Sequence, residues 1–284
     1  MPYKDLPDIT QKQIEIIELV YKFRFMNRHQ IQKIMGHKDY RRINAWLKDL
    51  VDKKYLGRIY SHKLLENTKP AIYYLDNHAI LWCRYNMGYK YRQDDELGTR
   101  EVKKFYDDKN ASETFRNHCL TLCDVYLQYK EREKDIKCEY QYLTKTELWT
   151  YSKTDKDFDE MKQYIPDVFI EKITESKKDV TSTTFCLELF DSHVPRYALE
   201  YKVRQYIKLH DEEDWKRYGG LDEAFPQILF ILPNQAKLNK LKNYIQELLS
   251  EAYDVEDITF MLTTYKKVME QGISKDIWNT VTEE

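Results

Sequence analysis

The first 60 residues show three consecutive segments in which apolar positions recur with a helical period. Thr10 and Asn27 precede the first two segments, and a glutamine follows each of them three residues later. This spacing fits a capping box, in which each side chain satisfies the backbone N–H of the other residue. Gly36 closes the second segment, where a left-handed residue is favoured. Asp39 can cap a third helix that runs to about Lys54.

The third predicted helix has two distinct faces. Its inward face is apolar from Ile43 to Val51, with the spacing of a core-facing helix. The outward face is polar and cationic, and comprises Tyr40, Arg41, Arg42, Asn44 and Lys48.

Two short strands are predicted after this helix, over Leu56–His62 and Ala71–Leu75, joined by a polar turn at 66–70. Three helices followed by a two-stranded hairpin is the order of a winged helix-turn-helix domain. In such a domain the third helix enters the major groove of DNA and the hairpin reaches the flanking backbone. We expect the outward face of the third helix to meet base edges, where arginine favours guanine and asparagine favours adenine. The expected phosphate contacts of the hairpin are Arg58, Lys63 and Lys69.

Two other interpretations of these residues stay open. Any surface helix presents a polar outer face, and some winged helices bind only other proteins.

The rest of the chain predicts a mixed α/β domain, so the fold class is α+β. Residues 76–87 are expected to form a short helix that closes the first domain, and 88–110 lack a sustained period. The domain prediction is therefore a winged helix over 1–87, a linker or extended connection over 88–110, and a mixed sheet flanked by helices over 111–284. Helices are predicted over 111–130, 195–214 and 234–251, and strands over 136–143, 164–171, 183–190, 227–232 and 258–264.

Charge divides the chain in the same way. Of the 284 residues, 46 are Lys or Arg and 48 are Asp or Glu. Residues 1–90 hold 17 of the basic and 9 of the acidic ones, so the first part is basic and the remainder is acidic. This asymmetry predicts double-stranded DNA as the partner of the first part. No apolar run is long enough to span a bilayer and the N-terminus has no signal-peptide pattern, so we expect a cytoplasmic protein without membrane contact.

The 111–284 region resembles the PD-(D/E)xK nuclease superfamily in its element order and in Pro166-Asp167 and Glu188. The resemblance implies a restriction-endonuclease-like fold, with Asp167 and Glu188 as magnesium ligands. The lysine of the motif is absent, because Phe190 stands two residues after Glu188 and Asp191 follows it. If the domain were a nuclease, Asp191 would join the ligands, and Lys202 would act as the general base or as a phosphate clamp.

Most of residues 9–232 resemble the replication-relaxation family found on plasmids and integrative elements of Gram-positive bacteria. The matching residues are Thr10-x-x-Gln13, Tyr73-Tyr74-Leu75, Asn117-His118, Pro166-Asp167, Glu188 and Lys202-x-x-x-Tyr206. The expected acidic residue two positions after Glu188 is again replaced by Phe190. The resemblance implies a role in plasmid replication, relaxosome function or conjugative transfer, with replication or relaxosome proteins as further partners.

Three functions follow from these observations. The first is a DNA-binding accessory or regulatory protein whose nuclease-like domain has no activity, needs no cofactor and forms a homodimer or recruits a partner. The second is a transcriptional repressor with a C-terminal ligand or dimerisation domain. The third is a nuclease that requires Mg²⁺.

Overall fold

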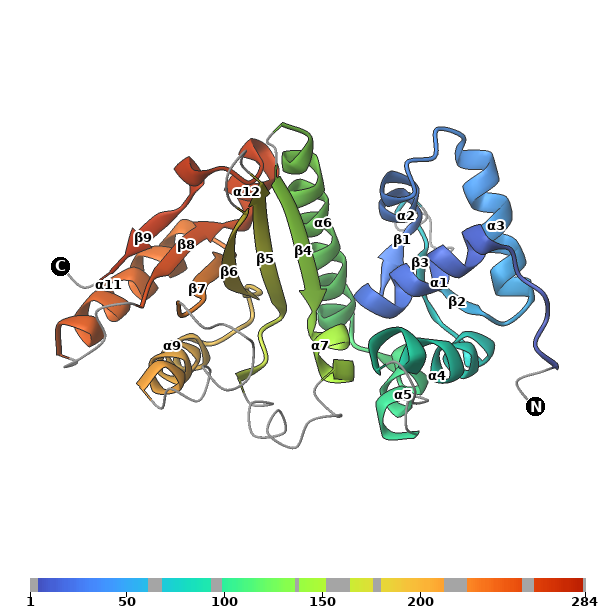
Figure 1. The fold of residues 1–284 in the computed structure, drawn as a ribbon, viewed down its shortest axis with the longest axis horizontal. Coiled ribbons are helices and arrows are strands. Elements are labelled where there is room, and N and C mark those ends of the chain that lie inside the picture. The colour runs from blue at the N-terminus through green and yellow to red at the C-terminus, as the bar shows by residue number, and fades with distance from the viewer. Residues whose placement is uncertain are drawn as a thin grey trace. The chain divides into compact units, whose positions relative to one another are not determined.

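The structure is a computed structural model of an α+β protein (Figure 1). It describes residues 5–60, 68–92, 99–135, 138–151, 164–175, 180–211, 224–251 and 258–282. The chain forms two compact units, which we describe separately. The first comprises Met1–Leu127 and Trp149–Thr154, and the second comprises Gln128–Leu148 and Asp155–Glu284. Within the described residues, no helix is long and apolar enough to cross a membrane.

The first unit is mainly helical and contains one small sheet with the strand order β1-β3-β2, in which all pairs are antiparallel. Its elements are α1 (Gln11–Phe23), β1 (Met26–Asn27), α2 (Arg28–Ile34), α3 (Tyr40–Asp52), β2 (Leu56–Ile59), β3 (Ile72–Leu75), α4 (Asn77–Arg92), α5 (Thr99–Tyr106), the 3₁₀ helix η2 (Asp108–Asn110) and the first part of α6 (Glu113–Asp135).

The predicted helix starts are confirmed by their hydrogen bonds. Asn27 Oδ1 accepts from the backbone N–H of Gln30 at 3.1 Å, and the Asn27 N–H donates to Gln30 Oε1 at 3.0 Å. The Thr10 N–H donates to Gln13 Oε1 at 2.9 Å. Gly36 has φ of +62°, the left-handed conformation expected after α2.

Gly57 lies inside β2, within the strand predicted over Leu56–His62. It pairs there with Tyr74 of β3. A Cβ atom at this position would lie 2.1 Å from the Tyr74 ring, so the close approach of the ring requires glycine.

Residues 88–110 are not an extended connection. The described part contains the end of α4, all of α5 and η2. Val102 and Phe105 are buried, and Asp108 is buried in an ion pair with Arg24. The apolar positions of this short segment pack into the first unit, which its weak periodicity did not indicate.

The second unit is built on a six-stranded sheet. Its elements are the end of α6, β4 (Cys138–Thr144), α7 (Lys145–Tyr151, whose end belongs to the first unit), β5 (Val168–Glu175), β6 (Val180–Leu189), α9 (Arg196–Asp211), β7 (Gln227–Leu232), α11 (Gln235–Glu251), β8 (Phe260–Thr264), α12 (Tyr265–Gln271), the 3₁₀ helix η4 (Lys275–Ile277) and β9 (Asn279–Val281).

The sheet is mixed, as predicted. Its strands run in the order β4-β5-β6-β7-β8-β9. Neighbouring strands are antiparallel from β4 to β6, parallel from β6 to β8 and antiparallel between β8 and β9. The helices α9 and α11 make the two crossovers that parallel neighbours require. The helix α7 and the edge strand β9 were not predicted.

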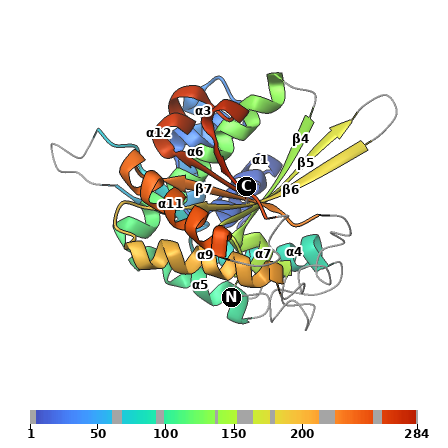
Figure 2. The same cartoon turned by 90° about the vertical axis from the view of Figure 1, so that its left-hand side faces the viewer.

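Each face of the sheet is covered by helices (Figure 2). The apolar sides of α9 and α11 pack on one face, in a core with Phe230 of β7 and Phe260 of β8. On the other face, Tyr129 of α6 packs against Tyr140 and Tyr142 of β4. Figure 2 shows α9 and α11 on one side of the strands and α12 on the other.

Candidate functional site

The predicted base-contacting residues lie on the solvent side of α3. Tyr40 is 50% exposed, Arg41, Arg42 and Lys48 are exposed, and Asn44 is half-buried. The inward face of α3 is buried in the core of the first unit, as predicted. Asp39 Oδ1 accepts from the Arg41 N–H at 2.9 Å and so caps the first turn.

The cationic side chains of α3 are available to a ligand. Among the described residues, no carboxylate forms an ion pair with Arg41, Arg42 or Lys48. The Arg41 guanidinium lies 5.9 Å from the centre of the Tyr40 ring, within the range of a cation–π contact. Arg41, Asn44 and Lys48 also share one side of the helix by their spacing.

Two of the three hairpin residues that were predicted to contact phosphates lie within the described part of the chain. Arg58 is exposed on β2, with its guanidinium 5.8 Å from the centre of the Tyr60 ring. Lys69 is exposed ahead of β3. Lys63 and the first two residues of the predicted turn, 66 and 67, lie outside the described residues.

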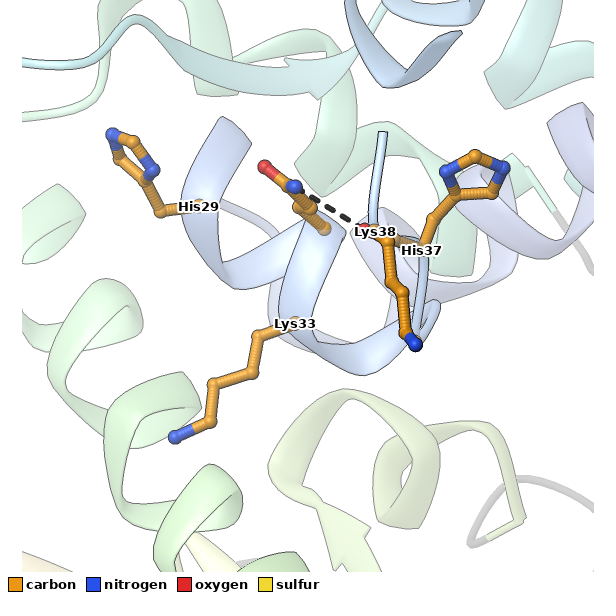
Figure 3. Close-up of a pocket in the computed structure, with 6 residues that line it drawn as sticks. His29, Lys33, His37 and Lys38 are labelled. Carbon is orange, nitrogen blue, oxygen red and sulfur yellow. Dashed lines mark hydrogen bonds between the residues drawn. The ribbon is translucent and has the colours of Figure 1, made fainter. Parts of the chain in front are cut away.

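A basic hollow at the α2–α3 turn was missed from the sequence (Figure 3). It has a volume of about 340 Å³, and Figure 3 shows cationic and imidazole side chains around it. The Gln32 side-chain amide donates to the His37 carbonyl at 3.2 Å and fixes the turn. The run of basic residues from Arg28 to Lys38 was the signal that could have revealed it. The lining residues are His29, Gln32, Lys33, Gly36, His37 and Lys38.

The helix α2 is held by a buried side chain of its own. Gln30 is 3% exposed, and its amide donates to the Leu120 carbonyl at 2.8 Å and to Asp124 Oδ1 at 2.7 Å, both in α6. The buried Gln30 amide is therefore paired with two acceptors on α6, which fixes the rotation of α2. This anchor sets the direction of the basic residues at its end.

In the second unit, the structure brings together two of the predicted carboxylates. Asp167 directly precedes β5, and Val168 pairs with Leu187 of β6. The antiparallel register then places Asp167 opposite Glu188. Asp167 Oδ2 accepts from the Leu189 N–H at 3.1 Å, so the backbone of β6 holds this carboxylate beside the strand.

Lys202 and Tyr206 of α9 complete the cluster around Glu188. Lys202 Nζ lies 2.8 Å from Glu188 Oε1, and the Tyr206 hydroxyl donates to the same oxygen at 2.6 Å. The two residues are one helical turn apart and thus project from the same side of α9. We name Asp167, Glu188, Lys202 and Tyr206 the carboxylate cluster. Sequence reasoning proposed all of them except Tyr206, which entered only through the family resemblance.

Burial dominates the electrostatics of the cluster. It raises the pKa of Glu188 to about 7, assisted by the negative charge of Asp167 and opposed by Lys202 and by the Tyr206 hydrogen bond. Burial, and after it the negative charge of Glu188, raises the pKa of Tyr206 well above its usual value. The neighbouring thiol of Cys186 has its pKa raised to about 12, chiefly by burial. Burial therefore favours the protonated, neutral forms of Glu188, Tyr206 and Cys186.

Asp191 does not join the cluster as a third ligand. In the described part of the chain, no three His, Cys, Asp or Glu residues are arranged so that they could hold a metal ion. Phe190 occupies the position of the missing lysine and packs on the sheet core, with its ring centre 5.3 Å from that of Phe230. The side of β6 that would carry the motif lysine is thus part of the apolar core.

The fold and these two sites define an α+β protein with an exposed basic helix in one unit and a buried carboxylate cluster in the other. The model of the replication-relaxation family matches residues 17–224. The chain belongs to the replication-relaxation family. No curated protein and no solved structure shows significant similarity to it. Membership supports a role in the replication or relaxation of a plasmid or other mobile element.

Proposed function

We propose that the protein binds double-stranded DNA in a sequence-directed manner and acts as an accessory or regulatory protein of a plasmid or mobile element. The observation that carries this proposal is the outward face of α3. Its exposed Arg41, Arg42 and Lys48 have no carboxylate partner among the described residues, in the basic part of the chain. A cationic helix face of this kind suits the major groove, where arginine and asparagine read base edges.

The element order supports a winged helix as the carrier of this face. Helices α1 and α2 precede α3, and the strands β2 and β3 pair directly after it. In this arrangement α3 is the recognition helix, and Arg58 and Lys69 of the hairpin contact the flanking phosphates. The basic hollow at the α2–α3 turn adds Lys33 and Lys38 to the same set of backbone contacts.

The second unit, in this proposal, has a nuclease-like fold without nuclease activity. A magnesium ion needs several oxygen ligands. Glu188 Oε1 is already bonded to Lys202 and Tyr206, and Asp167 Oδ2 is bonded to the backbone of β6. A divalent cation at this place would have to displace these partners, and no group of three His, Cys, Asp or Glu residues is placed to hold one among the described residues. The unit is then free to serve in dimerisation or in binding a replication partner.

DNA binding is tested with duplexes tiled across the plasmid or element that carries the gene. The double substitution Arg42→Ala and Lys48→Ala is expected to weaken binding at least tenfold, because it removes two cations of the face assigned to the major groove. It should also reduce the salt slope by about 1. Fluorescence anisotropy at several salt concentrations measures both quantities.

The matched control removes two exposed lysines of the same unit, Lys103 and Lys109. It should leave affinity unchanged. Equal binding by the wild type and the α3 variant would refute the assignment of α3, and an absence of binding to any duplex would refute the function.

The nuclease alternative has its own test. Supercoiled plasmid is incubated with the protein and Mg²⁺ or Mn²⁺, beside the Asp167→Ala variant. We expect no nicking by either protein. Nicking by the wild type that the variant lacks would establish the nuclease and overturn the inactive assignment.

A further inference from the structure

One side of α9 exposes two large aromatic residues to solvent. Tyr197 is 71% and Tyr201 55% exposed, whereas the opposite side of the helix is buried in the sheet core. Arg204 and Lys208 continue the same line toward the end of the helix and are also exposed. These four positions follow a spacing of four, three and four, so they form one stripe. Exposed aromatic residues gathered in this way mark interaction surfaces.

The helix α11 extends this surface with further cations. The two helices pack on the same face of the sheet, and Arg196 and Glu200 of α9 line a hollow with Lys237 and Lys240 of α11. The hollow measures about 130 Å³. Small-molecule pockets usually exceed roughly 300 Å³, so an extended ligand fits this surface better than a metabolite.

Hydrogen bonds fix several of these side chains. Arg204 donates to the Tyr244 hydroxyl of α11. Lys237 Nζ donates to the Ser192 carbonyl at 2.8 Å and to the Val194 carbonyl at 2.6 Å, which holds its charge at the start of α11. We define the α9–α11 face as Arg196, Tyr197, Tyr201, Arg204, Lys208, Lys237 and Lys240.

The charge of the α9–α11 face contrasts with the region around it in sequence. Residues 91–284 contain 29 basic and 39 acidic side chains. The defined face has five cations and no carboxylate, with Glu200 at its border and in an ion pair with Arg196. This local positive charge complements a polyanion.

We propose that the α9–α11 face binds single-stranded nucleic acid. Surfaces that bind single strands combine aromatic side chains, on which bases stack, with cations that follow the phosphates. Tyr197 and Tyr201 lie one turn apart, about 6 Å between their Cβ atoms, which suits two successive bases. A duplex keeps its base faces stacked inside and cannot use these rings. A second copy of the face would bring cations against cations.

The test measures binding of a fluorescent 20-nucleotide oligothymidylate to the full chain. The wild type should bind, and the double substitution Tyr197→Ala and Tyr201→Ala should lower affinity about tenfold or more, the size of effect that loss of base stacking gives. Both residues are exposed, so the fold should survive. Substitution of both by phenylalanine should retain binding, since the rings remain.

Tyr106→Ala is the matched control, because Tyr106 is 45% exposed in the first unit. Duplex binding by the Tyr197 and Tyr201 variant should be unchanged, which separates this proposal from the function assigned to α3. The proposal is overturned if the wild type does not bind the oligonucleotide, or if Tyr106→Ala has the same effect. It is also overturned if the double alanine variant binds the oligonucleotide as tightly as the wild type. This holds even if light scattering shows that the variant no longer forms a dimer.

Discussion

Each of the two units buries a carboxylate against a cation. In the first unit this pair is a structural anchor, whereas in the second unit it is a candidate for chemistry. Asp108 of the first unit is 1% exposed and pairs with Arg24, and Glu188 of the second is 5% exposed and pairs with Lys202. Burial raises the pKa of Asp108 to about 6 and that of Glu188 to about 7, in each case against the opposing charge of the partner. By burial and pKa the two sites are alike.

The partners of the two carboxylates differ in kind. Arg24 also donates to the Lys104 carbonyl at 3.1 Å, and its guanidinium lies 4.6 Å from the centre of the Phe115 ring. It thereby joins the end of α1 to α5 and α6, and arginine does not release a proton in proteins. Glu188 is bonded instead to an amine and a phenol, side chains that can serve as general acids or bases in enzymes. A raised pKa alone therefore does not identify a buried group as reactive. The chemistry of the residues bonded to that group has to be considered as well.

The largest effect is expected from Asp108→Ala. It removes the partner of Arg24 and leaves a mostly buried guanidinium without its charge partner. Breaking a buried ion pair from one side costs about 4 kcal/mol in free energy of unfolding. Urea unfolding followed by hydrogen exchange should locate this loss in α1, α5 and the start of α6.

Asp107→Ala is the matched control, because Asp107 is the exposed neighbour of Asp108. It should change stability by less than about 0.5 kcal/mol. A similar small loss in Asp108→Ala would mean that the ion pair does not anchor the first unit.

The second prediction is that the stability of the second unit varies with pH because of Glu188. Its pKa is raised from 4.5 to about 7 in the folded state, so its contribution to stability is fully present below pH 4.5 and is lost as the pH rises through 7. Between pH 4.5 and pH 7 the free energy of unfolding should fall by about 3 kcal/mol. In Glu188→Gln, which cannot ionise, this part of the pH dependence should disappear. Stability of the second unit is measured between pH 5 and 8.

Glu139→Gln serves as the control, since Glu139 is exposed on β4 of the same sheet. Its stability should vary with pH as in the wild type. If Glu188→Gln keeps the full pH dependence, Glu188 is ionised in the folded protein throughout pH 5 to 8. Its pKa would then not be raised by burial, in contrast to that of Asp108.

Local patterns were sufficient to predict much of this fold. The capping residues Asn27 and Gln30, the buried face of α3 and the strand β7 each follow from neighbours in the sequence. The prediction that the sheet is mixed needed one further rule, that parallel neighbours require a helical crossover. The helix predicted over 234–251 is present as α11, and Asn234 Oδ1 accepts from the Lys237 N–H at 2.9 Å at its start.

The features that were missed depend on distant contacts. Arg24 and Asp108 are 84 residues apart, so no local pattern reveals their pairing or the packing of α5. Phe190 could be recognised as a departure from a motif, but its position in the core depends on Phe230 of a later strand. The end of the chain around Ile277 was given no place in the predicted sheet. Ile277 is buried, and β9 pairs with β8.

The smallest effect tests whether the hydroxyl of Tyr206 matters to Glu188. Tyr206→Phe keeps the ring in the core but removes the hydrogen bond to Glu188 Oε1, at a cost of about 1 kcal/mol. Because this bond lowers the pKa of Glu188, its loss should move the midpoint of the pH-dependent stability upward. Tyr201→Phe, on the exposed side of the same helix, should leave the midpoint unchanged. An unchanged midpoint in Tyr206→Phe would mean that Lys202, and not the Tyr206 hydroxyl, stabilises the Glu188 carboxylate. The carboxylate cluster would then be an ion pair like that of Arg24 and Asp108.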